Sequence, residues 1–327
     1  ENAGVVVVAP FATVNDADSA DFDGGSLVVW FTANGQPEDR IGLRHEGTGA
    51  GQVGLSGNTV SYGGIAVGTF GGGGDGSTPL VVSFNANANL AAVQAVGRNV
   101  TYQNVSDAPS TLVRTIAGYV TDGDGGTSNV VSGTISLQPS NDAPVVTATP
   151  GSLSYDENAG PVAIDPGLAL ADVDSATLTG ATVRIATAYA SGEDVLGFAT
   201  QSGITGSWNA ASGTLTLSGT ATIAQYQAAL LSITYTNTSE NPSIGIRGVS
   251  FAVTDGTATS AAAPRQVQVV NWQDAPTTHD ASATGSEDAG SVAITLTGAD
   301  VDGTVASFAL TGLLAHGPLY ADVGLTT

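Results

Sequence analysis

The stretch Thr234-Tyr235-Thr236-Asn237 decides the fold, because a copy that differs at one residue occurs earlier in the chain. Residues 101–104 read Thr-Tyr-Gln-Asn, 133 residues earlier, and Val253-Thr254-Asp255-Gly256 repeats Val120-Thr121-Asp122-Gly123 at the same offset. Two motifs in one register indicate an internal duplication. The alternation of polar and apolar residues in Ser232-Ile233-Thr234-Tyr235 is typical of a half-buried strand. The chain is therefore predicted to consist of repeated β-domains.

A second set of motifs marks the start of each copy. Glu1-Asn2-Ala3-Gly4 recurs as Glu157-Asn158-Ala159-Gly160, and Asp16-Ala17-Asp18 recurs as Asp172-Val173-Asp174, both 156 residues apart. The two offsets differ by 23 residues, so the first copy contains an insertion. We place this insertion in the glycine-rich stretch near 47–76 and expect a longer hairpin or loop there.

A third copy begins with Glu287-Asp288-Ala289-Gly290 and Asp300-Val301-Asp302-Gly303. The copies meet at Asn141-Asp142-Ala143-Pro144 and at Gln273-Asp274-Ala275-Pro276. Proline favours an extended preceding residue and cannot donate to a sheet, so each meeting point is predicted to be a short, stiff linker. We expect domains at 1–142, 143–274 and 275–327, with the first truncated at its N-terminus and the third truncated at its end.

The composition excludes several classes of protein. The 327 residues carry 7 Lys and Arg against 29 Asp and Glu, a net charge of −22, so a basic surface for nucleic acid or for an anionic membrane is absent. No apolar run is long enough to span a membrane. Cysteine is absent, which excludes disulfides, cysteine-ligated metals and thiol catalysis. Hydrophobic residues make up 42% of the chain, so it can bury a core.

The fold class is predicted to be all-β, with tandem β-sandwich domains in an elongated array. About seven short strands per copy are typical of a sandwich. One segment in each of the first two copies has a helical period instead. Ile223, Tyr226, Leu230 and Leu231 follow the N-cap candidate Thr222, and Leu90, Val93 and Gly97 align with them in the first copy. A short helical crossover that packs on the core is expected in both copies.

The acidic motifs are predicted to converge at the ends of the domains. If successive strands of a sandwich reverse direction, the turn after the first strand lies at the bottom of its domain, while Asp-x-Asp and Thr-Asp-Gly lie at the top. The first junction then gathers Glu1, Asn141, Asp142, Asp172, Asp174 and Asp255, and the second gathers Glu157, Gln273, Asp274, Asp300 and Asp302. Asp16, Asp18 and Asp122 form half a site at the top of the first copy.

Clustered carboxylates repel one another unless a cation neutralises them. Ca²⁺ accepts six to eight oxygen ligands in tolerant geometry, whereas Mg²⁺ needs stricter octahedral order and Zn²⁺ prefers His or Cys. Ca²⁺ is therefore the predicted ion. A single Asp-x-Asp is more often a solvated turn, so the prediction depends on the convergence of four motif types.

The Glu-x-Ala turn, Asp-x-Asp, Thr-Asp-Gly and the Asn-Asp-Ala-Pro linker resemble those of cadherin-like tandem repeats in large calcium-dependent bacterial surface adhesins, including RTX-type biofilm adhesins. The third copy, with Ala315-His316-Gly317-Pro318-Leu319, is similar to a related cadherin or immunoglobulin-like repeat. The resemblance implies shared Ca²⁺ at each linker, an extracellular location and a spacer role. Trp272 and Gln273 depart from the pattern, so the second junction is expected to hold fewer ions or to bend differently.

No catalytic site is predicted. His45, His279 and His316 lie in different copies at positions that do not match, and Asn58 after Gly54-Leu55-Ser56-Gly57 spoils a nucleophile elbow. Paired carboxylates serve glycosidases, but here their positions repeat with the domain, as structural residues do.

The predicted function is a non-enzymatic, calcium-stiffened extender that holds a ligand-binding region away from the cell, with neighbouring repeats of the same chain as its partners. One alternative is a subunit of a self-assembling extracellular filament, surface layer or matrix polymer. A weaker alternative makes domain 1, with its insertion, a module for a glycan or protein ligand at a cell surface or in a matrix.

Overall fold

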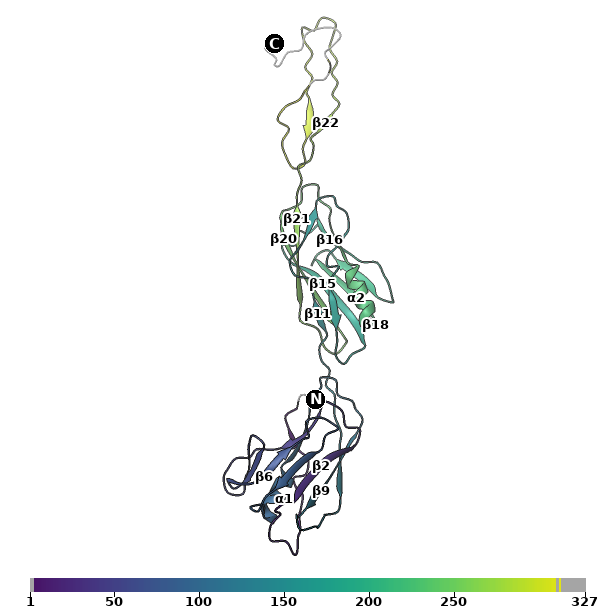
Figure 1. The fold of residues 1–327 in the computed structure, drawn as a ribbon. Helices are drawn as coiled ribbons and strands as arrows, with labels where there is room; N and C mark the ends of the chain where they lie inside the picture. Colours follow the sequence, from purple (N-terminus) through teal and green to yellow (C-terminus); the bar gives the residue numbers. More distant parts are fainter. Residues whose placement is uncertain (1–2, 310–311, 313–327) are drawn as a thin grey trace. The chain divides into compact units, whose positions relative to one another are not determined.

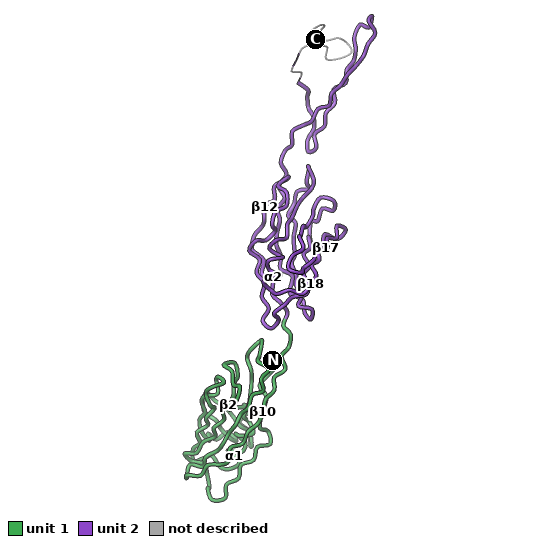
Figure 2. Tube along the Cα trace, turned by 90° about the vertical axis from the view of Figure 1, so that its right-hand side faces the viewer, with its two compact units in different colours: residues 1–142 green, residues 143–327 purple. Residues whose placement is uncertain are grey.

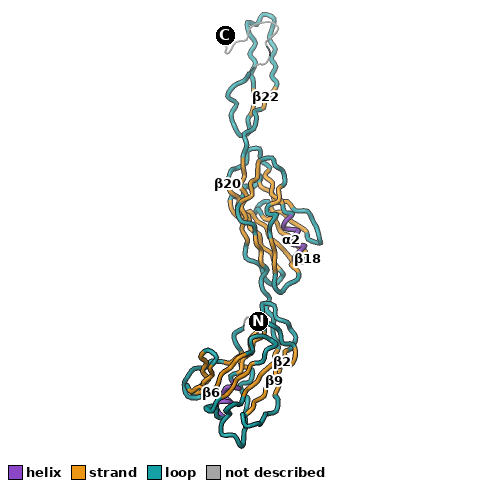
Figure 3. The backbone as a smooth tube through the Cα atoms, in the orientation of Figure 1, coloured by secondary structure: helices purple, strands orange, loops and turns teal. Residues whose placement is uncertain are grey.

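The computed structural model describes residues 3–309 and 312. The chain divides into two compact units, Glu1–Asp142 and Ala143–Thr327, and each is described by itself (Figure 2). Among the described residues, strands account for 41% and helices for 6% (Figure 3). The predicted all-β class, with sandwich domains and a helical crossover in each of the first two copies, is confirmed.

The first unit contains two antiparallel sheets around one core. Its strands form because apolar residues alternate, as in Leu80, Val82 and Phe84, which are buried between exposed neighbours. The larger sheet has the order β10 (Val131–Ile135), β9 (Arg114–Thr121), β2 (Ser26–Ala33), β7 (Leu80–Phe84), β6 (Ile65–Gly71), β5 (Thr59–Tyr62) and β4 (Val53–Ser56). The smaller sheet has the order β1 (Val6–Val7), β8 (Val100–Asn104) and β3 (Asp39–Leu43).

The second unit repeats this arrangement in its larger part (Figure 1). One sheet has the order β12 (Ser152–Asp156), β21 (Ala263–Val270), β20 (Gly245–Thr254), β15 (Thr177–Thr187), β18 (Thr214–Thr222) and β17 (Thr205–Asn209). The facing sheet is β13 (Val162–Ala163), β19 (Thr234–Asn237) and β16 (Asp194–Gly197). Two further pairs are β11 (Val145–Thr147) with β14 (Ala169–Ala171), and β22 (Thr277–His279) with β23 (Thr297–Ala299).

The glycine-rich stretch of the first unit extends its larger sheet. β6 of the first unit corresponds to β17 of the second, because β6 pairs with β7 as β17 pairs with β18. In the first unit the sheet continues beyond β6 with the hairpin of β5 and β4. In the described residues of the second unit, no strand lies beyond β17. Gly63 and Gly64, both with positive φ, make the turn between β5 and β6. The inserted residues are therefore largely ordered strand, with a turn at 72–79 before β7.

A nine-residue helix crosses from the larger sheet to the smaller one in each unit. α1 (Leu90–Arg98) begins at Asn89, whose side chain accepts a hydrogen bond from Ala92 N. α2 (Ile223–Leu231) begins with a capping box between Thr222 and Gln225. Each helix buries one face in the core of its unit. In the part of the chain that the structure describes, no helix is long and apolar enough to cross a membrane.

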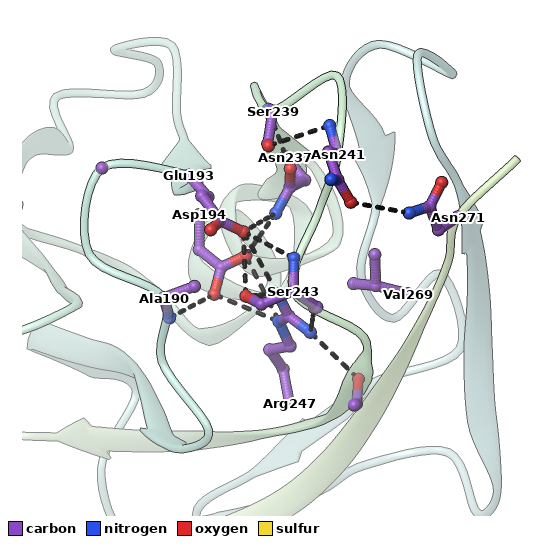
Figure 4. Close-up of polar contacts among 12 residues, drawn as sticks. Ala190, Glu193, Asp194, Asn237, Ser239, Asn241, Ser243, Arg247, Val269 and Asn271 are labelled. Atoms are coloured by element: carbon purple, nitrogen blue, oxygen red, sulfur yellow. Dashed lines mark hydrogen bonds and ion pairs between the residues drawn. The ribbon is translucent and has the colours of Figure 1, made fainter. Parts of the chain in front are cut away.

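A buried ion pair joins the two sheets of each unit. In the second unit Arg247 Nε on β20 lies 3.2 Å from Asp194 Oδ2 on β16, and both side chains are almost fully buried (Figure 4). In the first unit Arg114 Nε on β9 lies 3.1 Å from Asp39 Oδ2 on β3. The Tyr235 hydroxyl donates to Asp194, and its burial raises the pKa of this tyrosine. Each pair links a strand of the larger sheet to a strand of the smaller sheet, and removing either partner would leave a buried charge uncompensated.

Candidate metal centre

Three carboxylates of the second unit form the acidic cluster, defined as Glu157, Glu240 and Asp274. One oxygen from each lies within 4.8 Å of the others. Glu157 follows β12, Glu240 lies in the loop between β19 and β20, and Asp274 follows β21. The cluster therefore joins three segments that are distant in sequence.

The parallel pairing of β12 with β21 places Glu157 beside Asp274. The two strands run in the same direction and end side by side, where Asp156 pairs with Val270 and Glu157 N donates to Val270 O at 3.0 Å. The chain beyond β21 then returns to Glu157, because Trp272 N donates to Glu157 Oε2 at 3.0 Å. The turn and the linker are thus tied together at this edge.

Asparagine side chains position Glu240. Asn158, which has a left-handed φ of 61°, donates from Nδ2 to Glu240 Oε2 at 3.0 Å. The next residue of the loop, Asn241, accepts a hydrogen bond from Asn271 Nδ2 at 3.0 Å (Figure 4). At its other end the loop is fastened to the buried ion pair, because Arg247 Nη1 donates to Ser243 O.

Two oxygens of the cluster are buried without a partner. Glu157 is 8% exposed, and neither its Oε1 nor Asp274 Oδ2 has a hydrogen-bond partner among the described residues. None of the salt bridges in the described part of the chain involves Glu157, Glu240 or Asp274. A buried carboxylate without a counter-charge is costly, so this arrangement favours a cation between the three groups.

The Asp-x-Asp motif of the third copy lies against the same linker. Asp274 N donates to Asp302 Oδ2 at 3.0 Å, and Gln273 Nε2 donates to Asp302 Oδ1 at 2.7 Å. Asp300 Oδ1 is buried and has no hydrogen-bond partner within the described ranges. This motif therefore brings further carboxylate oxygens to the linker from the residues that follow it in the sequence, whereas Glu157 comes from the residues that precede it.

The residues present fit a hard divalent cation. All the ligand atoms that the cluster offers are oxygens, and Glu157 Oε1 and Asp274 Oδ2 are buried with no hydrogen bond to any residue that the structure describes. Ca²⁺ binds such oxygens in flexible geometry, whereas a zinc site would draw on His or Cys. Glu157, Glu240 and Asp274 are the residues that would hold the ion.

The residues assigned to the first junction lie on two units. Glu1 is outside the described residues, Asn141 and Asp142 belong to the first unit, and Asp172, Asp174 and Asp255 belong to the second. Asp172 Oδ1 accepts from Asp174 N and Ser175 N, while its Oδ2 is buried with no hydrogen-bond partner in the described chain. Burial raises the pKa of Asp172. Their joint role in a metal site stays a prediction.

The half-site of the first copy consists of local turns. Asp16 Oδ1 accepts from Asp18 N and Ser19 N, and the bond from Ser19 contributes most to lowering the pKa of Asp16. Asp122 Oδ1 accepts from Asp124 N and Gly126 N. In the described residues these carboxylates do not form a group of three, so their metal role also stays a prediction. Residues 315–319 of the third copy lie outside the described residues.

Glu240 was not predicted from the sequence, although a signal for it exists. Its counterpart at the 133-residue offset is Asp107, so both copies carry a carboxylate three residues after the Thr-Tyr-x-Asn motif. The repeat register could therefore have identified it. The buried Arg247–Asp194 pair was missed as well, although Arg114 and Asp39 stand at matching positions.

A pocket of about 360 Å³ in the first unit lies beside α1. Gly51 and Tyr62 of the inserted region line it together with Arg44 and Arg98. Arg44 Nη2 pairs with Glu46 Oε1 at 2.7 Å. Two of the 7 Lys and Arg residues of the chain therefore line the pocket, together with one acidic residue, Glu46.

Comparisons with known proteins add the following findings. No protein-family profile matches the chain. Halomucin of Haloquadratum walsbyi is 32% identical over 162 residues, which cover 47% of this chain and 2% of halomucin. The chain thus corresponds to a very small part of the curated relative that it matches.

Solved structures similar to the chain include cadherin ectodomains. Protocadherin Gamma B2 extracellular cadherin domains 1–5 gives a TM-score of 0.31 at 13% identity, over 82% of this chain and 39% of that chain. Human CDH23 EC21-23 gives 0.27 at 14% identity, over 82% and 70%. The sheets themselves define the class: this is a protein of tandem β-sandwich domains with an acidic cluster at the end of the second sandwich.

Proposed function

We propose that the chain is a non-enzymatic extracellular spacer, part of a bacterial surface adhesin, in which Ca²⁺ stiffens the linkers between β-sandwich repeats. The repeats are assigned to 1–142, 143–274 and 275–327. The observation that carries the proposal is the acidic cluster, whose buried Glu157 and Asp274 oxygens lack partners in the described chain. The resemblance of the sequence motifs to those of adhesin repeats and the strongly acidic composition of the chain also support the spacer function.

The proposed role of Ca²⁺ is to limit bending of the linker that follows the second sandwich. Without an ion, the carboxylates on either side of the linker repel, and a few side-chain hydrogen bonds hold 275–309 against the second sandwich. Glu157 and Glu240 of the sandwich and Asp274 of the linker are the residues that would hold Ca²⁺. With an ion held there, bending the linker at Asp274 would pull one oxygen ligand away, so the linker would be stiffer than in the ion-free chain.

Distance measurements across this linker test the proposal. Because the chain lacks cysteine, Ser207→Cys and Thr278→Cys place the only two spin labels at exposed positions on β17 and β22. We expect a narrow distance distribution in Ca²⁺ and a broad one in EDTA, with unchanged far-ultraviolet circular dichroism. The same labelled pair with Glu240→Gln should stay broad in Ca²⁺, whereas Asp280→Asn, an exposed carboxylate outside the cluster, should behave like the parent. Equal widths in Ca²⁺ and EDTA would refute the mechanism.

The assembly state separates this proposal from the polymer alternative. A spacer stays monomeric when Ca²⁺ is added, whereas a filament or surface-layer subunit forms ordered assemblies. Light scattering of the intact chain with and without Ca²⁺ distinguishes the two outcomes.

The pocket beside α1 supports a second candidate function, a ligand-binding module in domain 1. Arg44 and Arg98 line this volume with one acidic residue, Glu46, so the lining carries more positive than negative charge. A small acidic molecule matches that balance, and a hexuronic acid is the glycan unit that carries a negative charge. Titration calorimetry with glucuronate tests this function. Arg44→Gln should abolish binding, and Arg184→Gln, an exposed arginine of the second unit, should not. No heat of binding to the parent chain would exclude this ligand class.

A further inference from the structure

The larger sheet of the first unit carries a tryptophan on the face that points away from the core. Leu27 and Val29 of β2 are buried in the core. Because successive residues of a strand point to opposite faces, the alternate residues Val28 and Trp30 lie on the outward face. Both are half-buried, so part of each side chain is open to solvent.

The strands on either side of β2 extend this apolar surface. On β9, Tyr119 pairs with Val28 and Ala117 pairs with Trp30 (Figure 1). On β7, Val81 pairs with Val28 and is 37% exposed. Side chains of directly paired residues share one face of a sheet, so these residues lie together. Val28, Trp30, Val81, Ala117 and Tyr119 are defined as the aromatic face.

The second unit has different residues at the same positions of its sheet. Ala181 pairs with Val253 as Leu27 pairs with Val120, and the two valines match in the repeat, so β15 corresponds to β2. In the order given above, the counterparts of the aromatic face are Thr182, Arg184, Thr216, Ser250 and Ala252. These residues are polar or small, so the fold does not require aromatic side chains at these positions.

The corresponding face of the second unit is open to solvent. Thr182, Arg184 and Thr216 are exposed there, although β11 and β12 are both present in that unit. Neither of these strands therefore covers the outward face of the larger sheet. The aromatic face lies on the solvent side of a sandwich of this type and not between two of its layers.

The two rings of the aromatic face form a corner. The ring centres of Trp30 and Tyr119 are 5.7 Å apart, and the ring planes are inclined by 68°. Ala117 points outward yet is only 4% exposed, so its neighbours on the face cover it. A corner between two aromatic planes accommodates one ring-shaped group, whose face packs on one plane while its edge meets the other.

The surroundings of the corner indicate a neutral ligand with hydroxyl groups. Arg114 is the one charged residue on β2, β7, β9 and β10, and its side chain is buried in the ion pair with Asp39. A charged ligand would therefore lose water at this face without gaining a counter-charge. Thr32, the next outward residue after Trp30, and Ser132, which pairs with Ala117, are exposed and offer hydroxyls beside the rings.

The aromatic face is too small for a stable protein partner. A standard protein interface covers about 800 Å² on each side, whereas a large aromatic side chain offers about 150–250 Å² in all. Both rings of the face are half-buried, so less than this is free. Two copies of a chain with a net charge of −22 also repel each other.

We infer that the aromatic face binds a neutral hexose unit of a glycan. The carbon-bound hydrogens on one side of the sugar pack on the electron-rich face of one ring, and the edge of the sugar meets the other ring. The hydroxyls of Tyr119, Thr32 and Ser132 exchange hydrogen bonds with those of the sugar. The site shares no residue with the pocket beside α1 and is independent of Ca²⁺ and of the acidic cluster.

Saturation-transfer NMR on the intact chain tests the inference, because it detects the weak binding expected of a single sugar unit. The probes are methyl β-D-galactopyranoside and methyl β-D-glucopyranoside. We expect saturable transfer from the protein, strongest to the carbon-bound protons on one face of the sugar ring. EDTA and Arg44→Gln should leave this binding unchanged, whereas failure of the calcium or glucuronate proposals would leave it intact. No transfer to either glycoside would overturn the inference.

Three variants locate the site. Trp30→Arg and Tyr119→Ala introduce the residues that the second unit has at the equivalent positions, so the sheet accepts them, and each should weaken binding at least tenfold. Phe11→Ala is the matched control, because Phe11 is an aromatic residue of the same unit that is 89% exposed and lies outside the aromatic face.

Two further results would overturn the inference. One is equal affinity of the parent, Trp30→Arg and Tyr119→Ala, or an equal loss in Phe11→Ala, since sugar would then bind elsewhere. The other is self-association that Trp30→Arg abolishes, without sugar binding, which would show that the face pairs two copies of the chain. Light scattering of the same samples measures this association.

Discussion

Replacing Glu240 with Gln should change the stability of the second unit in two opposite ways. In EDTA the variant loses two of the three repulsions in the acidic cluster, whose oxygens lie within 4.8 Å of one another. Coulomb's law gives about 1 kcal/mol for each pair at this separation in water-like surroundings, so the variant should be about 2 kcal/mol more stable at low salt. For a unit of this size that corresponds to about 4–8 °C in Tm.

Calcium should then stabilise the variant less than the parent. At a Ca²⁺ concentration of 100 times Kd, an ion that binds only the folded state adds about 2.7 kcal/mol. If the lost carboxylate weakens binding tenfold, the same concentration adds about 1.4 kcal/mol. Neutralising a ligand thus raises the stability of the ion-free protein and halves the gain from Ca²⁺.

Scanning calorimetry in EDTA and in Ca²⁺ measures both effects. Asp280→Asn removes the same charge from an exposed position outside the cluster and should match the parent in both buffers. The reasoning is refuted if Glu240→Gln melts like the parent in EDTA and gains as much from Ca²⁺.

Three further predictions concern parts of the chain outside the cluster. Arg247→Met should cost about 3–5 kcal/mol in urea unfolding because Asp194 is left buried without its counter-charge, whereas Arg184→Met, at an exposed position, should cost much less. Hydrogen bonds from Ser77 and Thr78 lower the pKa of Asp75 to about 2. Its contribution to stability should therefore be complete above its ordinary pKa of 3.8 and be lost as pH falls through about 2; carboxyl titration by NMR with a midpoint near 4 would contradict this. Thr222→Ala should cost about 1 kcal/mol by removing the capping box of α2, whereas the neighbouring exposed Thr220→Ala should leave thermal unfolding nearly unchanged.

Local patterns in the sequence are sufficient for the fold class and for the two helices. Period-two alternation such as Thr214-Leu215-Thr216-Leu217 forms a strand because one face of the sheet is buried. The spacing of Tyr226 and Leu230 after Thr222 identifies α2, because the cap and the apolar face depend only on residues within a few positions. The order of the motifs also brings Glu157 and Asp274 to one end of a sandwich, where the structure places them together.

The tertiary structure decided what depends on pairing between distant segments. Glu240 joins the cluster only because β19 and β20 bring their connecting loop to the edge where β12 and β21 end. Arg247 meets Asp194 because their strands face each other across the core, which no local period encodes. Composition and period therefore determine which segments become strands, whereas the long-range register of those strands determines which charges meet, since register is set by the packing of the whole sheet.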